Sequence, residues 1–419
     1  MTQSPSASVR RTPRRARARG RPWRWLAIAT GAGLGLVLAL WVAIHRYDWM
    51  GPLVANSLRS LVGPERVARL EDWVYGVEDI ANRALRRNEP PKTYWSVPAT
   101  PNAPLTAPPA VSSPADGPRL PAFRPKDPGP ALKKWSAKGD GIWVPIVDPR
   151  RPGEEPFLFK TLLHPDVGRS WAELFVVALD LRRVDVHVVA GSQEPKSEDP
   201  KNQAYVRTAR IPDDQHDELL AAFNGGFMTE HGGYGMKVDG HVLVTPKPNA
   251  CTLALYEDGS MRVASWKYLA ESEPKMRWYR QAPECMYENG KIHPGLTAGS
   301  GLKWGATLDG DTVIRRSAVG LNVSGSILYV AISNHTTARV FADGLRHAGA
   351  TDIAQLDVNW SYPKFVLFEP RQPGEERKAV ALASGFEFSE DEYIRRKSRR
   401  DFFYVVRKGP SSAVPPLSD

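Results

Sequence analysis

Three short segments of the chain combine polar or charged residues with glycines or with the end of an apolar run. They are residues 222–228 (AFNGGFM), 315–320 (RRSAVG) and 354–361 (AQLDVNWS). Loops at strand ends can present functional groups on a rigid scaffold, and paired glycines allow close backbone approaches that other residues forbid. Taken singly, each segment also fits an ordinary role: a tight turn, a surface arginine pair or a strand-end cap. The candidate site residues in them are Asn224, Gly225, Gly226, Arg316, Ser317, Asp357, Asn359 and Ser361.

Several common catalytic patterns are absent from the sequence. There is no GxGxxG after an expected strand, no Walker A motif, no HExxH, no CxxC and no GxSxG. The nine histidines form no cluster with metal-ligand spacing. Classical nucleotide, zinc and serine-hydrolase sites are therefore disfavoured. We expect no cofactor, and the sequence leaves metal dependence open.

Together and in this order, the segments resemble the phosphodiester glycosidase family. Its pattern has an NGGFF-like loop, a hairpin of the form G-hydrophobic-x-V-x-G, an R-T/S-A-I/V-G segment, a helix, and a strand ending in LDGGGS. The matching residues are 224–228 (NGGFM), 235–240 (GMKVDG), 316–320 (RSAVG), a helix expected over 338–348, and 356–361 (LDVNWS). The resemblance covers roughly residues 170–370.

The resemblance implies hydrolysis of a sugar-1-phosphate diester at the anomeric carbon. Such a reaction needs an anion clamp for the phosphate, and the forked guanidinium of Arg316 suits that role. It also needs a carboxylate as base or nucleophile, which implies Asp357. Asn224, with the backbone of Gly225 and Gly226, would bind sugar or phosphate oxygens. The further binding residues implied are Ser317, Asn359 and Ser361.

Two residues outside the family pattern, Glu230 and His231, follow the glycine pair closely enough to be considered as proton carriers. For Asp357 the alternative to catalysis is structural. A carboxylate at a strand end often caps nearby backbone amides.

The last segment departs from the family pattern, because Val358, Asn359 and Trp360 stand where the family has three glycines. Glycine there would allow a close approach or a positive φ, and valine and tryptophan obstruct both. Two functions therefore stay open. One is a membrane-anchored hydrolase of a sugar-1-phosphate diester or related envelope glycan. The other is a catalytically inactive relative that binds glycan or organises membrane proteins.

The segments lie in a globular domain expected over residues 133–408. Apolar strand-like runs occur at 174–181, 184–189, 252–256, 319–323, 327–332, 364–368 and 402–406. Hairpin turns are expected at Asp239-Gly240, Asp258-Gly259, Asn289-Gly290 and Ser324-Gly325. Helices are expected over 213–222 and 338–348. These elements predict an α+β fold with a mostly antiparallel sheet and a few packed helices.

The net charge of +10 belongs mainly to one end of the chain. Residues 1–24 hold eight arginines and no acid, which leaves 48 Lys+Arg against 46 Asp+Glu elsewhere. The nearly neutral body argues against a nucleic-acid partner. Residues 25–44 form a charge-free run of twenty residues, long enough to span a bilayer. We therefore predict a basic cytoplasmic tail (1–24), a transmembrane anchor (25–45) and a periplasmic or extracellular C-terminal domain. A cleaved signal peptide and a buried core helix are the alternatives.

Three further regions have simpler compositions. Residues 46–87 include an amphipathic helical pattern over 52–87, interrupted at Gly63-Pro64. That pattern suits a partner helix, a bilayer surface, or a helical pair that packs on itself. Residues 88–132 are predicted to be a proline-rich linker, with thirteen prolines between positions 90 and 130. Residues 409–419 are expected to form a disordered tail.

The chain has two cysteines, Cys251 and Cys285. In an oxidising compartment they could close a loop worth about 3–4 kcal/mol as a disulfide. Spacing alone does not separate that arrangement from two buried thiols.

Overall fold

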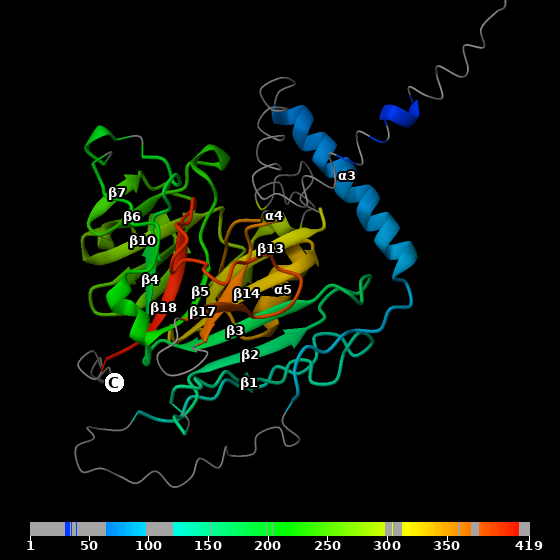
Figure 1. Cartoon of the computed structure of the whole chain (residues 1–419), viewed down its shortest axis with the longest axis horizontal. Helices are drawn as coiled ribbons and strands as arrows, with labels where there is room; N and C mark the ends of the chain where they lie inside the picture. Colours follow the sequence, from blue (N-terminus) through cyan, green and yellow to red (C-terminus); the bar gives the residue numbers. More distant parts are fainter. Residues whose placement is uncertain are drawn as a thin grey trace, which may run out of the picture. The chain divides into compact units, whose positions relative to one another are not determined.

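The computed structural model describes residues 64–97 and 120–409, with gaps at 152, 198, 203, 298–303, 305–311, 359–360 and 370–376, and a few residues between 30 and 39. The chain divides into two units, residues 1–67 and 68–419. The sheets among the described residues all lie in the second unit, and their paired strands are antiparallel throughout (Figure 1).

The largest sheet has eight strands and carries two of the candidate segments. Its central strands β3, β14 and β13 pair over seven or more residues each, and most of their side chains are buried. The strands in spatial order are β1 (Val144–Pro145), β2 (Leu158–Leu163), β3 (Leu174–Asp180), β14 (Ile327–Thr336), β13 (Ile314–Leu321), β15 (Asp352–Gln355), β11 (Tyr287–Glu288) and β12 (Lys291–Ile292).

Two five-stranded sheets complete the strand structure. One is ordered β7 (His241–Val244), β6 (Met236–Val238), β10 (Met276–Ala282), β8 (Cys251–Tyr256) and β9 (Met261–Ser265). The other is ordered β17 (Lys378–Ala381), β16 (Phe365–Glu369), β5 (Leu219–Asn224), β18 (Phe402–Arg407) and β4 (Val184–Val189). Trp278 on β10 donates from its indole nitrogen to the Val186 carbonyl on β4 at 3.1 Å, so these two sheets meet directly.

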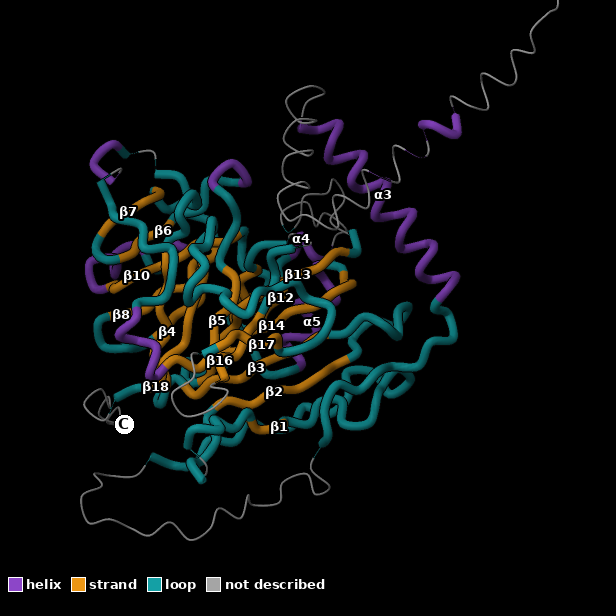
Figure 2. The backbone as a smooth tube through the Cα atoms, in the orientation of Figure 1, coloured by secondary structure: helices purple, strands orange, loops and turns teal. Residues whose placement is uncertain are grey.

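Helices are few among the described residues (Figure 2). The α-helices are α3 (Pro64–Leu85), α4 (Pro294–Thr297) and α5 (Ala338–His347). The 3₁₀ helices are η1 (Pro200–Asn202), η2 (Asp213–Glu218), η3 (Thr229–His231), η4 (Trp266–Tyr268) and η5 (Ala270–Lys275). Helix α5 begins where the Thr337 hydroxyl accepts the Val340 amide at 3.2 Å, a normal N-cap. Its apolar face packs on the large sheet.

The three sheets share one hydrophobic core. It joins Val319 of the large sheet, Leu253 of the second and Phe223 of the third. Smaller clusters cover the outer faces of the second and third sheets. Along β5, Leu220, Ala221 and Phe223 belong to the shared core, while Leu219 and Ala222 belong to the outer cluster. The pairing of β5 with β18 shifts its register between Leu219 and Ala221, which interrupts strict alternation. The strand has apolar clusters on both faces, and every one of its residues is buried.

The predicted fold class was wrong. Antiparallel sheets dominate and helices are few, so the domain is mostly β rather than α+β. The helix expected over 213–222 is instead the 3₁₀ helix η2 followed by strand β5. A short apolar run such as LLAAF suits a buried helix or a buried strand equally well by periodicity, and pairing with β16 and β18 makes it a strand.

The fold-class prediction also placed a transmembrane helix ahead of the domain. Most of residues 25–45 lie outside the described residues, and no helix in the described part of the chain is both long and apolar enough to cross a membrane. The predicted tail at 1–24 and all but the first residue of the tail predicted at 409–419 also lie outside the described residues.

Local predictions within the domain were more accurate. All four predicted turns join adjacent strands, and Asp239-Gly240 and Asn289-Gly290 have positive φ at both positions, as type I′ hairpins require. The helix predicted over 338–348 is α5. Cys251 and Cys285 form a disulfide with a Cα–Cα separation of 4.7 Å.

Both described ends of the proline-rich segment pack on the domain. Phe123 is buried, and its ring lies edge-on to Phe159 at 5.6 Å. Tyr94 lies edge-on to Phe175 at 4.8 Å, and its hydroxyl donates to Glu173 at 2.6 Å. Residues 98–119 lie outside the described residues. Helix α3 begins at Pro64, where the sequence pattern is interrupted, and the preceding residues 52–63 are not described.

Candidate active site

Four of the predicted residues meet where the third sheet approaches the large one. Asn224 ends β5, and its amide nitrogen donates to the Ser317 hydroxyl on β13 at 2.8 Å. That hydroxyl donates to the backbone carbonyl of Asp357, two residues beyond β15, at 2.9 Å. The Asp357 amide in turn donates to the Gly225 carbonyl at 3.2 Å. Asn224, Gly225, Ser317 and Asp357 therefore form one connected hydrogen-bonded group.

Arg316 is not part of this group. It is fully buried, and its guanidinium donates to the carbonyls of Thr336, Trp304 and Thr312 and to the side-chain oxygen of Gln355. Burial lowers the pKa of Arg316 to about 9, so it stays protonated near neutral pH. Four hydrogen bonds to protein oxygens favour a structural role here over the predicted phosphate clamp.

The remaining residues of the third segment are less informative. Ser361 is half-buried in the turn before β16. Asn359, predicted to bind substrate, lies outside the described residues, as does Trp360.

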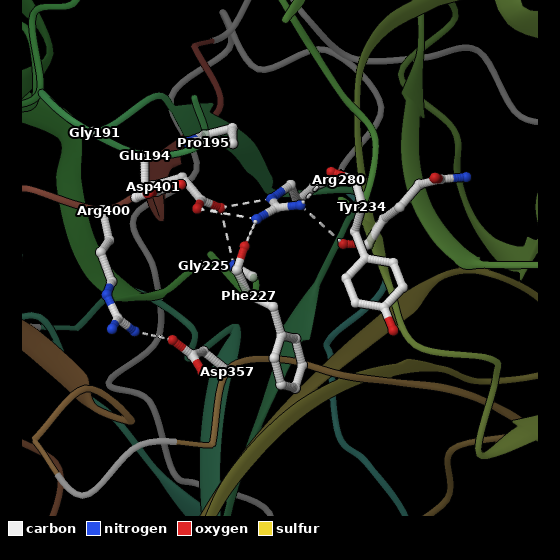
Figure 3. Close-up of polar contacts among 12 residues, drawn as sticks. Gly191, Glu194, Pro195, Gly225, Phe227, Tyr234, Arg280, Asp357, Arg400 and Asp401 are labelled. Atoms are coloured by element: carbon white, nitrogen blue, oxygen red, sulfur yellow. Dashed lines mark hydrogen bonds and ion pairs between the residues drawn. The ribbon is translucent and has the colours of Figure 1, made fainter. Parts of the chain in front are cut away.

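The carboxylate of Asp357 forms an ion pair with Arg400, which lies two residues before β18 in the chain (Figure 3). Oδ1 of Asp357 accepts the Val358 amide at 2.8 Å, and Oδ2 accepts from Nη1 of Arg400. Burial raises the pKa of Asp357 above its ordinary value, while Arg400 and His231 oppose that rise. Burial alone would lower the pKa of Arg400, but Asp357, Tyr362, Asp401 and Glu194 together outweigh it and the pKa is raised. The site therefore contains a buried carboxylate with heightened proton affinity beside a cation.

Besides Asp357, Arg400 contacts a ring and a sulfur atom, and its side chain stays partly exposed. Its guanidinium lies over the Tyr362 ring at 4.7 Å, and Nη2 donates to the Met228 sulfur at 3.0 Å. Thioether sulfur is a weak acceptor. The side chain of Arg400 is 14% exposed, so part of it reaches solvent.

A second ion pair, between Arg280 and Asp401, lies next to the first (Figure 3). Both side chains are about 1% exposed. Nε and Nη2 of Arg280 donate to the Asp401 carboxylate at 2.8 and 3.2 Å. The other N–H groups donate to the carbonyls of Phe227, Tyr234 and Gln281 at 2.6 to 3.1 Å. All five guanidinium donors are thus used, and the pair joins β10 to the start of β18.

This second pair explains the two adjacent glycines. The amides of Gly225 and Gly226 donate to the backbone carbonyl and the carboxylate of Asp401, at 3.0 and 2.9 Å. A Cβ at Gly225 would lie 2.2 Å from the Asp401 carboxylate, and one at Gly226 would lie 2.7 Å from the Arg280 guanidinium. Glycine is needed here for close approach, as the sequence suggested. Both amides already have protein acceptors, however, so they do not point freely at a substrate.

The two proposed proton carriers lie on η3, just beyond the glycine pair. His231 is near enough to Asp357 to lower its pKa. Nε2 of His231 lies 3.7 Å from a carboxylate oxygen of Glu230, which is 42% exposed. His231 therefore belongs to the surroundings of the candidate carboxylate, and Glu230 lies toward solvent.

Four residues of the site were missed by the sequence analysis: Arg280, Tyr362, Arg400 and Asp401. A signal was available for three of them. Arg280 lies on a strand whose residues are all buried except Arg277, and the Arg400-Asp401 dipeptide directly precedes the apolar run FFYVV. Charged residues inside or beside buried strands are almost always paired. The pairing itself spans 121 residues between Arg280 and Asp401 and could not be read from local spacing.

The arrangement can support acid–base chemistry next to an anion. Asp357 supplies a proton-binding oxygen, and Arg400 supplies a cation suited to phosphate or carboxylate. Within the described part of the chain, no group of three or more His, Cys, Asp or Glu residues could hold a metal ion.

Comparison with known proteins gave likenesses in structure only. No protein-family model matches the chain, and no curated protein sequence matches it. Among solved structures, the chain is similar to the zebrafish N-acetylglucosamine-1-phosphodiester alpha-N-acetylglucosaminidase catalytic domain auto-inhibited by its pro-peptide. The identity is 16%, covering 64% of this chain and 88% of that one, with a TM-score of 0.40.

Two further structures are similar at lower identity. A hypothetical protein from Synechocystis is 9% identical, over 60% of this chain and 62% of that one, with a TM-score of 0.39. A putative exported protein from Burkholderia pseudomallei is 11% identical, over 56% of this chain and 74% of that one, with a TM-score of 0.25. These likenesses concern the fold alone.

Proposed function

We propose that the chain is a hydrolase of sugar-1-phosphate diesters or related envelope glycans, with Asp357 as its catalytic carboxylate. The single observation that supports this best is the contact between Asp357 and Arg400 beside the glycine pair. It places Asp357, which lies in a segment that resembles the phosphodiester glycosidases, against a partly open cation that comes from outside those segments. Arg400 takes the phosphate-binding role first considered for Arg316, because Arg400 is accessible and Arg316 is not.

The reaction would break the bond between the anomeric carbon and the phosphate oxygen. A water oxygen forms the new bond to that carbon, and the phosphate monoester leaves with the electron pair of the broken bond. Asp357 accepts the proton of the attacking water, a role for which a raised carboxyl pKa is suited near neutral pH. Phosphate is a good leaving group, so the demand for a strong general acid is small. Arg400 stabilises the charge that develops on it.

Substrate binding and activation of Asp357 would be coupled through Arg400. In the absence of substrate, the guanidinium pairs with Asp357 and holds down the pKa of that carboxyl. A substrate phosphate competes for the same guanidinium. Once Arg400 turns to the phosphate, Asp357 loses its largest favourable charge partner and becomes a stronger base.

Turnover of defined phosphodiesters tests the proposal. The probes are benzyl diesters of several hexose 1-phosphates and N-acetylhexosamine 1-phosphates, with phosphorus NMR following release of benzyl phosphate. We expect turnover by the wild type, a loss of about 100- to 10,000-fold in Asp357→Asn, and near-normal rates in Arg399→Met. Arg399 is the exposed neighbour of Arg400 and serves as the matched control. Normal turnover by a folded Asp357→Asn would exclude Asp357 as the catalytic carboxylate.

A second function is favoured by a specific observation. Both carboxylate oxygens of Asp357 are occupied within the protein, by Val358 and Arg400, which fits a strand-end cap. In a catalytically inactive module that binds such glycans, Asp357 would keep both of these contacts permanently. Binding of the same diesters without any release of phosphate monoester, across the whole panel, would establish this function instead.

A further inference from the structure

An open hollow of about 550 Å³ lies beside the C-terminal end of helix α3. We call it the basic groove. Its volume is within the usual range for ligand pockets, about 300–1,000 Å³. None of its lining residues belongs to the candidate active site. The residues that matter for its chemistry are Arg83, Arg87, Asn88, Lys134, Trp135 and Trp171.

The walls of the groove are held together by buried polar contacts. Arg169 donates from Nε and Nη2 to the two carboxylate oxygens of Asp79 on α3, both at 2.7 Å. The Ser170 hydroxyl donates to the Glu89 carbonyl, in the turn after α3, at 2.6 Å. Arg169 is 6% exposed and Ser170 is 2% exposed. These bonds fix the last turns of α3 against residues 167–171, so the groove is largely pre-formed.

Three cations line the groove, and no carboxylate does. Arg83 shares Asp79 with Arg169, at 2.9 Å. Arg87 and Lys134 are exposed, and neither makes an ion pair with any residue that the structure describes. Asn88 adds an exposed amide. The local charge is therefore positive and partly uncompensated, which favours an anionic ligand.

Two indole rings supply an apolar surface beside these cations. Trp135 is half-buried, and its ring nitrogen donates to the Val167 carbonyl at 2.9 Å, which fixes the ring. The Lys134 ammonium lies 4.8 Å from the centre of that ring. Trp171 is 6% exposed and also lines the groove. A rigid aromatic ring next to charged donors suits a ligand with one apolar face and several polar groups.

We propose that the basic groove binds an acidic oligosaccharide. The acid groups contact Arg87 and Lys134, and the C–H face of one sugar ring packs on Trp135. A simple anion would not need the indole ring, and a neutral sugar would not need the cations. This inference does not depend on the proposed hydrolase activity, because it uses none of the same residues.

Calorimetric titration of the full chain tests the proposal with three matched probes. Trigalacturonic acid carries both acid groups and sugar rings, maltotriose carries only the rings, and tripolyphosphate carries only the charge. Trigalacturonic acid contains no phosphodiester, so its binding is separable from turnover at Asp357. We expect it to bind at least about 10-fold more tightly than either other probe, with an affinity that falls as salt is added.

Variants identify the groove as the site. Arg87→Ala with Lys134→Ala should weaken trigalacturonic acid binding at least about 10-fold. Trp135→Ala should also weaken it, while Trp135→Phe, which keeps an aromatic ring, should retain most of the affinity. The matched control is Lys267→Ala, since Lys267 lies over the exposed Tyr268 ring at 5.0 Å in the same way.

Several results would overturn the proposal. One is the absence of trigalacturonic acid binding by the wild type. Another is equal affinity for tripolyphosphate, which would show that charge alone is recognised. A third is unchanged binding in the Arg87→Ala, Lys134→Ala variant while Lys267→Ala weakens it.

Discussion

Arg400 and Asp401 are neighbours in the chain, yet they belong to two ion pairs with different properties. The pair of Asp401 with Arg280 is about 1% exposed on both sides, and all five guanidinium donors have protein acceptors. The pair of Arg400 with Asp357 is 14% and 5% exposed, and one of its donors faces only a sulfur atom. The first pair is closed, and the second has capacity left for a ligand.

The difference shows that two adjacent residues at the start of a strand can have different roles, one structural and one functional. Burying a charge is costly unless its hydrogen bonds are all satisfied. The Arg280–Asp401 pair meets that condition and fixes the glycine loop between two sheets. In the Arg400–Asp357 pair the hydrogen bonds are satisfied less completely. Burial therefore raises the pKa of Asp357.

The largest effect should come from breaking the closed pair. Arg280→Met leaves the Asp401 carboxylate buried without its partner, and we expect a loss of about 3–5 kcal/mol in the free energy of unfolding. Urea unfolding measures it. Arg277→Met is the control, because Arg277 lies on the same strand but is exposed, and it should change stability by less than about 0.5 kcal/mol. A loss below about 1 kcal/mol in Arg280→Met would contradict the structural role.

Replacing both partners sharpens the same point. In Arg280→Met with Asp401→Leu, no charge is left unpaired, so the double variant should be more stable than the sum of the two single changes predicts. Additive losses would mean that the two side chains act independently.

Arg400→Met should affect activity more than stability. Asp357 can take up a proton when its partner is removed, because burial already raises its pKa. We therefore expect a destabilisation clearly smaller than that of Arg280→Met, together with a loss of about 100-fold or more in phosphodiester turnover. The kcat and KM of Arg400→Met and Arg399→Met measure the activity, and thermal unfolding measures the stability. If Arg400→Met destabilises the protein more than Arg280→Met does, the proposed distinction between the two ion pairs is wrong.

The glycine loop should tolerate no added methyl group. Gly225→Ala places a Cβ 2.2 Å from the Asp401 carboxylate and 2.3 Å from its backbone carbonyl, and the backbone cannot move aside easily. We expect a loss of about 1–3 kcal/mol, measured by urea unfolding. At Gly168 the nearest atom to an added Cβ lies 3.6 Å away, so Gly168→Ala serves as a control and should be nearly neutral.

The smallest effect concerns pH. The folded-state pKa of Asp357 is raised above 3.8, the value taken for the unfolded chain, so the native state binds this proton more tightly. The stability that results is present below the unfolded-state pKa and is lost as pH rises through the folded-state pKa. Wild type should therefore lose stability relative to Asp357→Asn as the pH increases from about 4 toward neutrality. Parallel stability profiles, measured by urea unfolding at several pH values, would contradict the raised pKa.

The sequence predicted local features well and long-range pairings poorly. Turns such as Asn289-Gly290 depend on two adjacent residues with positive φ, and the sequence shows both. The need for glycine at 225 and 226 was also visible. The reason for that need was not visible in the sequence. Asp401 lies 175 residues from Gly226, which it contacts, and Arg280 lies 53 residues from Phe227, which it contacts.

Arg316 and residues 219–224 show why the rest was missed. Arg316 occupies the position implied by the family pattern, but pairing of β13 with two neighbouring strands buries it completely. Residues 219–224 have the composition of a buried helix or strand, and only their partners in the sheet decide between the two. In both cases the deciding contacts come from other parts of the chain.

The exchange of Arg400 between Asp357 and a phosphate is tested most directly by the titration of Asp357 itself. Carbon NMR of the aspartate carboxyl groups, assigned with Asp357→Asn, gives the pKa of Asp357 with and without saturating hexose 1-phosphate. We predict a pKa above the ordinary aspartate value in the free protein, and a further rise when the phosphate takes Arg400. If Asp357 has an ordinary pKa that does not change when hexose 1-phosphate binds, the proposed exchange of Arg400 between Asp357 and the phosphate is contradicted.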